Sequence, residues 1–440
     1  MLFAYFNDTM ILMKKLQDNP KYDLIVIGGG PSGMMMAGRA CELGARVLIL
    51  EKNKHLGKKL QITGGGRCNI TNAEFDVRKF LSNFPESKEF LFSPFSKFSA
   101  KDTFTFFEKK KLPLVIEARK RAFPQSQKAD DVFKVLEKYI KKGEGEIKTD
   151  VQVVKMSKEG DKIISVETKS GEKYFAKNFA IATGGASASW TGSTGDGFRW
   201  LKKLGHAIKE PNANLVPLTT NDKWIHRISG LTLSFMTIRF IQNNKTKLKK
   251  TGKILFTHFG ISGPLILNSA YEVKKLLEKG PVTASIDMFP DTEENDLDKR
   301  VLKLFEKNKN KVLKNIFPEL VQKNLAIEIL NLPDINLSER EANSITKLER
   351  KNLVRKLKNL SFEITGTLGL DKAIISDGGI VLEEVNFKNM SSKIYSNLYL
   401  LGDVLNINRP SGGFSLQLCW TTGWTAGTDV GEKVAQKKKN

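Results

Sequence analysis

Residues 23–51 read DLIVIGGGPSGMMMAGRACELGARVLILE, and no other part of the chain constrains the architecture as strongly. The apolar runs Asp23–Ile27 and Arg46–Leu50 are typical of buried strands, and Met34–Leu43 between them has helical periodicity. The glycines form the pattern G-x-G-x-x-G at the turn from the first strand into the helix. The stretch therefore predicts a βαβ unit with a dinucleotide-binding turn.

Each glycine of this turn has its own physical role. Gly28 makes the tight turn, Gly30 lets a pyrophosphate approach the backbone, and Gly33 allows close packing of helix on strand. The helix directs its free N–H groups toward the phosphates, and Glu51 is placed to accept hydrogen bonds from ribose hydroxyls. The cofactor contacts predicted here are Gly28, Gly30, Pro31, Ser32, Gly33, Glu51 and Lys52.

A second glycine-rich segment, GKKLQITGGGRCNITN, occupies residues 57–72. So many glycines disfavour a helix or a central strand and predict a loop whose backbone comes close to another group. A solvent-exposed turn is the alternative, but such a turn does not need three glycines followed by Arg, Cys and Asn. We expect this loop to contact the cofactor through Thr63, Gly64, Gly65, Arg67, Cys68 and Asn69.

Two further segments complete the predicted binding site. Short alternating strands over residues 146–182 predict a β-meander, and its last strand ends in small residues that let the chain return beside a dinucleotide. Near the C-terminus, a strand over Leu398–Leu401 precedes a Gly-Asp pair, and a glycine turn introduces a final helix. The contacts predicted from these segments are Val153, Ala182, Thr183, Gly184, Gly402, Asp403, Gly413, Phe414, Ser415 and Leu416.

Three of these features together resemble the glutathione-reductase-like flavoprotein superfamily. They are Glu51 after the glycine turn, the Ala182-Thr183-Gly184 strand end, and the late Gly402-Asp403 pair. In that superfamily the cofactor is FAD, and the resemblance implies that the Asp403 carboxylate hydrogen-bonds the ribityl chain of the flavin.

A narrower resemblance rests on residues 64–72, on residues 182–187 with 191–197, and on residues 256–264. These segments are similar to one bacterial family of NAD(P)/FAD-dependent oxidoreductases, which includes bile-acid reductases that saturate a steroid dienone. The similarity extends over residues 22–427. It implies FAD as the resident cofactor and NAD(P)H as a transient reductant that docks over the flavin.

One segment departs from that family. The family usually carries GEVLDVDG near the C-terminus, whereas this chain reads GDVLNINR over residues 402–409. Asp403 keeps a carboxylate, Asn406 and Asn408 remove two negative charges, and Arg409 adds a positive one. If those acids take part in the reaction of the relatives, the substrate or the rate of this protein should differ.

The predicted fold class is α/β, a Rossmann-type FAD-binding domain with an inserted β-barrel-like part and a small helical cap. A chain of 440 residues exceeds the size at which one hydrophobic core keeps growing. The expected organisation is an N-terminal extension over residues 1–20, the first part of the FAD-binding domain over 21–210, a β-barrel-like insert over 211–290, a helical insert over 291–360, and the return to the FAD-binding domain over 361–435.

The net charge of +23 would by itself suggest nucleic acid or an anionic surface as a partner. The basic residues, however, are spread over segments such as 134–142 and 303–314, without the interleaved aromatic residues of a nucleic-acid groove. Two interpretations stay open: a lysine-rich surface without a partner, and a functional basic face, which would also attract a phosphate-bearing nicotinamide.

The remaining composition predicts a cytoplasmic protein without a metal site. Three cysteines and four histidines at unrelated spacings indicate neither a disulfide framework nor zinc ligands. The apolar run Met1–Met13 is interrupted and too short to span a bilayer. We therefore expect no membrane insertion.

The sequence does not identify a catalytic residue, but it offers three candidates. His258 could protonate a substrate carbon at neutral pH, with a purely structural histidine as the alternative. Arg67 could clamp an anionic substrate or a cofactor phosphate, with a surface role as the alternative. Cys68 could be a redox thiol, although it lacks a CxxC partner and a packing role is the alternative.

Together with the resemblance, these residues predict an FAD-dependent oxidoreductase. The leading hypothesis is a reductase, driven by NAD(P)H, that transfers hydride through the flavin to a small enone-like organic substrate. An oxidase or dehydrogenase that uses oxygen or a quinone is one alternative, because it would use the same FAD cradle. An RNA-associated flavoprotein is another, because of the positive charge, and it predicts salt-sensitive RNA binding.

Overall fold

The chain folds into two units. The computed structural model describes residues 20–369 and 375–439. Unit 1 comprises Met1–Ala213 and Ile374–Asn440, and unit 2 comprises Asn214–Ala373. The N-terminal extension predicted over residues 1–20 lies outside the described residues, apart from Pro20.

The centre of unit 1 is a parallel sheet around the buried strand β1 (Tyr22–Ile27). β1 pairs in parallel with β2 (Val47–Leu50) and β9 (Lys173–Ile181), and Ile25 lies opposite Leu48 and Phe179. The neighbours β6 (Glu146–Lys148) and β19 (Leu398–Leu400) are also parallel. β7 (Val153–Glu159) and β8 (Lys162–Thr168) continue the sheet as antiparallel strands. This arrangement confirms the predicted α/β, Rossmann-type fold.

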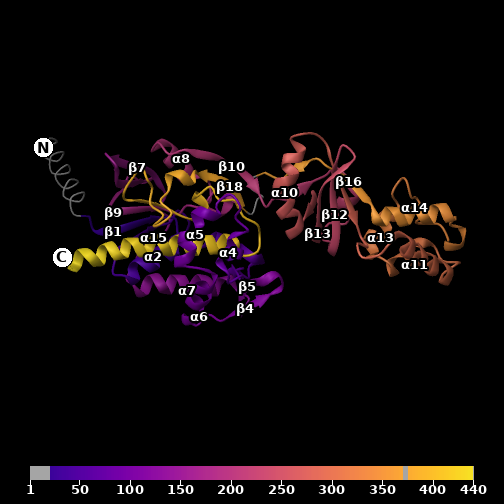
Figure 1. The fold of residues 1–440 in the computed structure, drawn as a ribbon, viewed down its shortest axis with the longest axis horizontal. Helices are drawn as coiled ribbons and strands as arrows, with labels where there is room; N and C mark the ends of the chain where they lie inside the picture. Colours follow the sequence, from indigo (N-terminus) through magenta and orange to yellow (C-terminus); the bar gives the residue numbers. More distant parts are fainter. Residues whose placement is uncertain (1–19, 370–374, 440) are drawn as a thin grey trace. The chain divides into compact units, whose positions relative to one another are not determined.

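The helix α2 (Pro31–Glu42) packs between α7 (Ala129–Lys142) and the long C-terminal helix α15 (Phe414–Lys439). Figure 1 shows α2 and α15 side by side. Glycines at four-residue spacing on α15 allow this approach, because a Cβ on Gly423 would lie 2.5 Å from the Ser32 carbonyl oxygen, and one on Gly427 would lie 2.6 Å from that of Met36.

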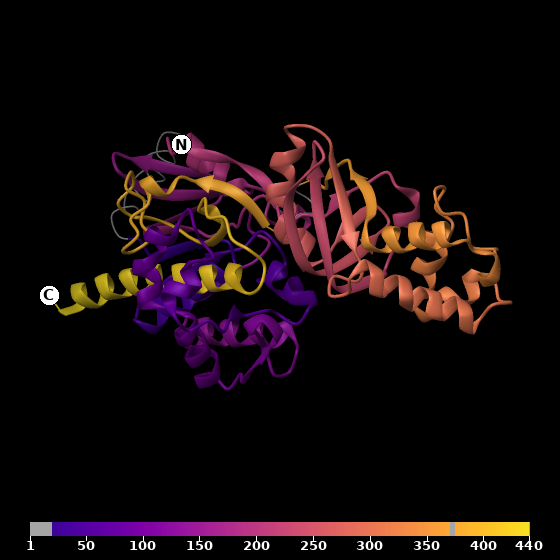
Figure 2. The same ribbon diagram turned by 45° about the vertical axis from the view of Figure 1, so that its right-hand side comes forward.

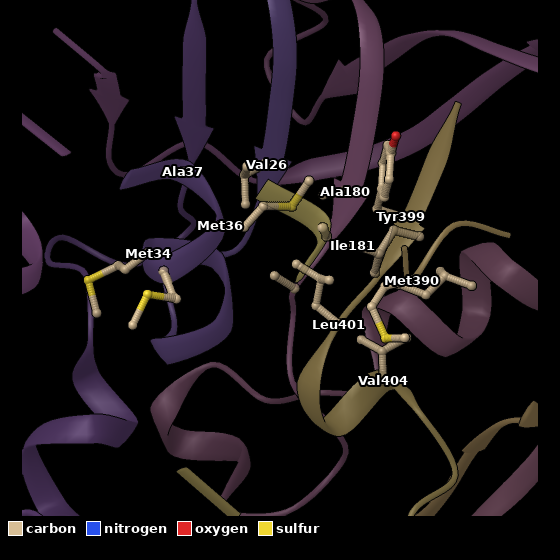
Figure 3. Packing of buried hydrophobic residues seen from close by; sticks show 14 of the residues in the cluster. Val26, Met34, Met36, Ala37, Ala180, Ile181, Met390, Tyr399, Leu401 and Val404 are labelled. Atoms are coloured by element: carbon tan, nitrogen blue, oxygen red, sulfur yellow. The ribbon is translucent and has the colours of Figure 1, made fainter. Parts of the chain in front are cut away.

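The core of unit 1 lies between the sheet and these helices. Val26 of β1, Ala180 and Ile181 of β9, and Met34 and Met36 of α2 are fully buried. Figure 3 shows them with residues of the C-terminal part of the chain, namely Met390, Tyr399, Leu401 and Val404. Burial of each large apolar side chain stabilises the fold by about 1.5–3 kcal/mol. The segment that returns after unit 2 is therefore an integral part of the unit 1 core.

The glycine-rich segment 57–72 is not a loop throughout, so that prediction was wrong. It contains the short helix α3 (Lys58–Ile62), a 3-10 turn over Thr63–Gly65, and the strand β3 (Thr71–Asn72). The five residues after Gly57, Lys58–Ile62, complete one helical turn. Gly64, Gly65 and Gly66 then adopt φ of 59°, 70° and 84°, a backbone conformation that ends a helix.

The other elements of unit 1 surround this framework. β3, β5 (Arg121–Pro124) and β4 (Leu114–Glu117) form a small antiparallel sheet, and β10 (Ile208–Asn214) pairs with β18 (Ile375–Ile380). The remaining α-helices are α4 (Val77–Leu81), α5 (Lys88–Lys97), α6 (Ala100–Lys109) and α8 (Asp196–Lys203).

Unit 2 is built on an antiparallel sheet with the order β16-β15-β12-β13-β14-β11-β17. Its central hairpin joins β12 (Thr232–Gln242) to β13 (Lys245–Thr257) through two asparagines with positive φ, which suits a two-residue turn. The other strands are β11 (Leu218–Thr219), β14 (Gly260–Ser262), β15 (Val282–Asp287), β16 (Leu360–Ile364) and β17 (Gly366–Thr367).

The helices of unit 2 are α9 (Lys223–Arg227), α10 (Pro264–Leu277), α11 (Glu294–Lys307), α12 (Leu313–Ile316), α13 (Lys323–Leu330) and α14 (Lys347–Lys358). Figure 2 shows those between β15 and β16, in orange, beyond one end of the sheet. β16 alternates buried and exposed residues and pairs with β15. Unit 2 therefore runs to Ala373, past the return to the FAD-binding domain that the sequence placed at residue 361.

Candidate functional site

A pocket lies at the carboxyl ends of β1, β2 and β9, within unit 1. Its lining includes Gly28 after β1, Glu51 after β2 and Ala182 after β9, and its empty volume, open mouth included, is about 1100 Å³. Ligands of open α/β sheets bind outside the carboxyl ends of the strands. The pocket therefore lies where the sequence places the cofactor.

Many residues predicted as cofactor contacts line this pocket. They are Gly28, Gly30, Pro31, Ser32, Glu51, Lys52, Thr63, Val153, Ala182, Thr183, Gly184, Asp403, Ser415 and Leu416. The predicted residues that are not among its lining are Gly33, Gly64, Gly65, Arg67, Cys68, Asn69, Gly402, Gly413 and Phe414. Lining residues that the sequence did not reveal include Lys59, Gln152, Asp196, Trp200 and Cys419. Asp196 could have been predicted, because it lies in the family-like segment 191–197. The sequence around the other four residues gives no such indication.

The three fingerprint glycines leave different amounts of space. A Cβ on Gly28 would lie 2.5 Å from the Ala182 carbonyl oxygen, and one on Gly33 would lie 2.1 Å from that of Gly28. A Cβ on Gly30 would meet nothing closer than 3.9 Å. Two glycines therefore hold backbone segments together, while Gly30 leaves an open side in the pocket. This arrangement fits a pyrophosphate group that approaches the backbone.

The N-terminus of α2, which is the positive end of the helix dipole, lies at the pocket beside Gly30. Its N-cap is Gly30, which provides no side-chain acceptor, and its first turn contains no acidic residue. Pro31 and Ser32, the first two residues of α2, line the pocket. Backbone N–H groups at a helix N-terminus bind phosphate groups. The helix end therefore fits the cofactor that the glycines imply.

Glu51 is held in place by its own turn. Its Oε2 accepts a hydrogen bond from the Gly29 N–H at 2.8 Å, and its Oε1 accepts from the Asn53 backbone N–H at 2.8 Å. The two oxygens of a carboxylate have about four lone-pair sites, so Glu51 keeps acceptor capacity toward the pocket. With the Asn53 side-chain amide, which also donates to Oε1 at 2.7 Å, three donors fix the carboxylate where ribose hydroxyls would bind.

Lys52, which lines the pocket, forms an ion pair with Asp196, another lining residue. Its Nζ lies 2.6 Å from Asp196 Oδ2 and donates to Thr194 Oγ1 at 2.6 Å. Burial alone would raise the pKa of Asp196, but the hydrogen bonds from Lys52 and Thr194 outweigh it and lower that pKa. The aspartate stays ionised, so Lys52 links β2 to the loop before α8.

Two charged residues of the lining, Lys59 and Asp403, form a charge cluster with the buried Arg409 behind them. The Arg409 guanidinium is only 1% exposed and donates to Asp403 Oδ1, to the Ile407 carbonyl oxygen at 2.6 Å and to Ser415 Oγ at 3.1 Å. Lys59 Nζ lies 3.9 Å from Asp403 Oδ2. Burial lowers the pKa of the Lys59 ammonium, and Asp403 opposes that effect. Two cations share one carboxylate, so the cluster has formal charge +1.

Several predicted contacts instead form a layer behind the pocket wall. A Cβ on Gly413 would lie 2.3 Å from the Thr71 backbone carbon, so the turn before α15 is pressed against β3. A Cβ on Gly402 would lie 2.9 Å from Ser32 Oγ. Beneath them, the Gln417 side chain accepts hydrogen bonds from Thr71 and Thr103. This layer positions the lining residues.

Two of the three catalytic candidates, Arg67 and Cys68, are not among the residues that line the pocket. Arg67 pairs with Glu117 at 2.9 Å and stacks 4.2 Å from the centre of the Phe123 ring. Cys68 is fully buried, and neither residue is among the pocket lining. His258 belongs to unit 2, where it is exposed between β13 and β14.

The thiols are expected to be unreactive in the folded protein. Cys41, Cys68 and Cys419 are free and buried, and burial raises the pKa of each to about 12. Because the thiolate is the nucleophile, alkylation by iodoacetamide near neutral pH should label all three only after unfolding. Mass spectrometry of native and denatured samples tests this. Rapid labelling of Cys68 in the native protein would restore it as a redox candidate.

Within the described ranges, no helix is long and apolar enough to cross a membrane. The same residues contain no group of three or more His, Cys, Asp or Glu side chains placed to hold a metal ion.

Comparison with known proteins places this geometry in a family. The family model described as "HI0933-like protein Rossmann domain" matches residues 22–429. The 3-dehydro-bile acid delta(4,6)-reductase of Clostridium scindens is 28% identical over 414 residues, which cover 93% of this chain and 98% of the reductase. The ribosomal RNA dihydrouridine synthase of Haemophilus influenzae is 26% identical over 430 residues, covering 92% of this chain and 98% of the synthase.

Among solved structures, a 3-ketosteroid delta1-dehydrogenase from Sterolibacterium denitrificans has a TM-score of 0.53 at 12% identity, with 94% of this chain and 99% of that chain covered. At that identity the likeness concerns the fold alone. The family match covers nearly the whole chain and coincides with the glycine cradle, the α2 terminus and Glu51. The chain therefore belongs to the HI0933-like Rossmann-domain family and is an FAD-dependent oxidoreductase.

Proposed function

We propose that this enzyme uses NAD(P)H to saturate a carbon–carbon double bond conjugated to a carbonyl group. The observation that carries the proposal is the charge cluster of Lys59, Asp403 and Arg409 at the FAD pocket, with formal charge +1. A fixed positive charge stabilises the anionic reduced form of a bound flavin, so it favours reduction of the flavin by a nicotinamide. FAD, when bound, supplies the hydride transfer itself.

The reductant is proposed from the number of nucleotide sites. The chain has one complete G-x-G-x-x-G fingerprint, at residues 28–33, and the FAD uses it. NAD(P)H would therefore dock transiently, leave as NAD(P)⁺, and be replaced by the substrate. Over the full cycle NAD(P)H is oxidised, its hydride goes to the β-carbon of the conjugated system, and a proton from solvent goes to the α-carbon.

Two substrate classes share this chemistry. The names of the relatives describe reduction of a 3-oxo bile acid at delta(4,6) and formation of dihydrouridine in ribosomal RNA. In both, the reduced double bond is conjugated to a carbonyl group. A uridine in RNA is our second candidate because the chain carries a net charge of +23, which favours a polyanionic substrate.

The reductive step can be tested before the substrate is known. The purified protein should show a flavin band at about 450 nm, and under anaerobic conditions NADH or NADPH should bleach it. A steroid enone, free uridine and a uridine-containing RNA would then be tested for reoxidation of the bleached protein. Bound FAD that neither nicotinamide bleaches would contradict the proposal and favour an oxidase or dehydrogenase.

A further inference from the structure

Six lysines line a hollow on the surface of unit 1. They are Lys109, Lys110, Lys111, Lys134, Lys138 and Lys142, and we call this site the lysine groove. Among the described residues of its lining, Asp131 is the only acid. The formal charge of the lining is therefore +5, from six lysines and one aspartate.

Two helices form the groove. Lys134, Lys138 and Lys142 recur at four-residue spacing on α7, so they project from one face of that helix. Lys109 is the last residue of α6, and Lys110 and Lys111 follow it in a turn. A third wall comes from the segment after β5, where the Gln125 N–H donates to the Pro113 carbonyl oxygen at 2.8 Å. Backbone structure therefore fixes the outline of the groove.

Most of this charge has no internal partner. Lys134 pairs with Asp130 at 2.6 Å, whereas the other five lysines make no ion pair with the described residues. Lys110 is half-buried, with its Nζ 3.9 Å from the centre of the Tyr139 ring. Burial lowers the pKa of Lys110; the nearby Glu42 carboxylate opposes that effect, and the charge of Lys142 adds to it. The fold thus holds like charges together and compensates them only in part, through Asp130 and Glu42.

Helix dipoles account for only part of this arrangement. A lysine in the last turn of a helix interacts favourably with the negative end of the helix dipole. This interaction explains the positions of Lys109 and Lys142. Lys134 and Lys138 lie farther from the end of α7, where that effect has faded. Like charges four residues apart on a helix destabilise it. A polyanionic partner would remove this repulsion.

The helix α7 also connects the groove to the FAD pocket. Its first residue, Ala129, donates its N–H to the Gly66 carbonyl oxygen at 2.9 Å. The Phe133 ring packs against Gly57, which lines the pocket. A 14-residue helix is about 20 Å long. A steroid is too short to reach from the pocket along this helix, but an RNA strand is long enough.

We propose that the lysine groove binds the phosphate backbone of an RNA whose base enters the FAD pocket. This inference rests on the RNA substrate proposed above. Lysines act as point charges toward phosphate, so they position a strand without reading its sequence. The groove should therefore bind RNA with little sequence preference, and the pocket should select the base.

The test compares two quadruple variants of the full-length FAD-loaded protein. The groove variant carries Lys109→Gln, Lys111→Gln, Lys138→Gln and Lys142→Gln, all at exposed positions. The control variant carries Lys155→Gln, Lys162→Gln, Lys169→Gln and Lys173→Gln, which are equally exposed and lie on or beside β7, β8 and β9. Both variants lose the same charge. Thermal unfolding and flavin content should match those of the wild type.

Binding of a fluorescein-labelled, uridine-rich RNA hairpin is measured by anisotropy at several salt concentrations. The wild-type slope of log affinity against log salt should become shallower by about 3 in the groove variant, since each phosphate contact contributes about 0.7–0.9. The control should keep the wild-type slope. Equal losses in both variants, or no RNA binding by the wild type, would overturn the inference.

The binding assay needs no turnover, so it separates this inference from the proposed function. Groove-dependent RNA binding by a protein that NAD(P)H cannot bleach would support the groove and reject the reductase. The opposite result is bleaching by NAD(P)H and reoxidation by a steroid enone, with RNA binding that does not depend on the groove. It would support the reductase and reject the groove.

Discussion

The variant Gly28→Ala is expected to be purified almost free of flavin. Gly28 has φ of +105°, and its Cβ would lie 2.5 Å from the carbonyl oxygen and 2.8 Å from the carbonyl carbon of Ala182. Both are backbone atoms at the end of β9, so relief requires β1 and β9 to separate where the pocket begins. The backbone conformation alone costs about 1–3 kcal/mol. FAD affinity should fall at least about tenfold, which corresponds to 1.4 kcal/mol.

The measurement is the flavin-to-protein absorbance ratio, followed by titration of FAD into the apoprotein. Gly171→Ala is the matched control, because Gly171 also has positive φ but a Cβ there would meet nothing within 4 Å. It lies in the turn between β8 and β9, away from the pocket lining. The control should lose a little stability and keep its flavin. Wild-type flavin content in Gly28→Ala would mean that this pocket is not the FAD site.

The parts of the fold that the sequence predicted are those set by local chemistry. The run from Tyr22 to Glu51 contains a strand, a glycine turn, a helix and a strand in direct succession, and each is visible without knowing its partners. The packing of α15 on α2 is different. The sequence alone does not show why α15 carries Gly423, Gly427 and Gly431. Their role, to let α2 approach closely, is visible only in the folded structure.

The missed elements have the same explanation. The glycines at 64–66 predicted a loop, whereas Lys58–Ile62 forms one turn of helix that contacts α7. Likewise, β16 pairs with β15 across the helices between them. Pairing between residues so far apart in sequence leaves no local pattern.

At the site, the sequence predicted the residues that surround the cofactor better than those that take part in the reaction. Glu51 and the residues around Thr183 were found because they follow buried strands. Lys59 and Cys419 join the lining from helices whose sequences show nothing unusual. Arg409 was visible as a departure from the family pattern, but its pairing with Asp403 depends on the turn between them.

Replacement of that arginine, Arg409→Met, is expected to have the second large effect. The side chain is 1% exposed, and the Asp403 carboxylate with which it pairs is 13% exposed. Methionine fills similar space but leaves the Ile407 carbonyl oxygen and Ser415 without this donor, and Asp403 with Lys59 alone, 3.9 Å away. Removing one partner of a buried ion pair costs about 3–5 kcal/mol. Thermal unfolding should therefore shift down by about 10 °C.

The variant should also lower the midpoint potential of the bound flavin, because one positive charge near the pocket is lost. Potentiometric titration measures this, and a tenfold change in relative affinity for the two redox states corresponds to about 30 mV. Arg199→Met is the control: Arg199 pairs with Asp196 but is 64% exposed. Exposed pairs contribute about 0–1 kcal/mol, so its stability should hardly change. An Arg409→Met protein with wild-type stability and potential would show that the charge cluster supports neither the fold nor the flavin.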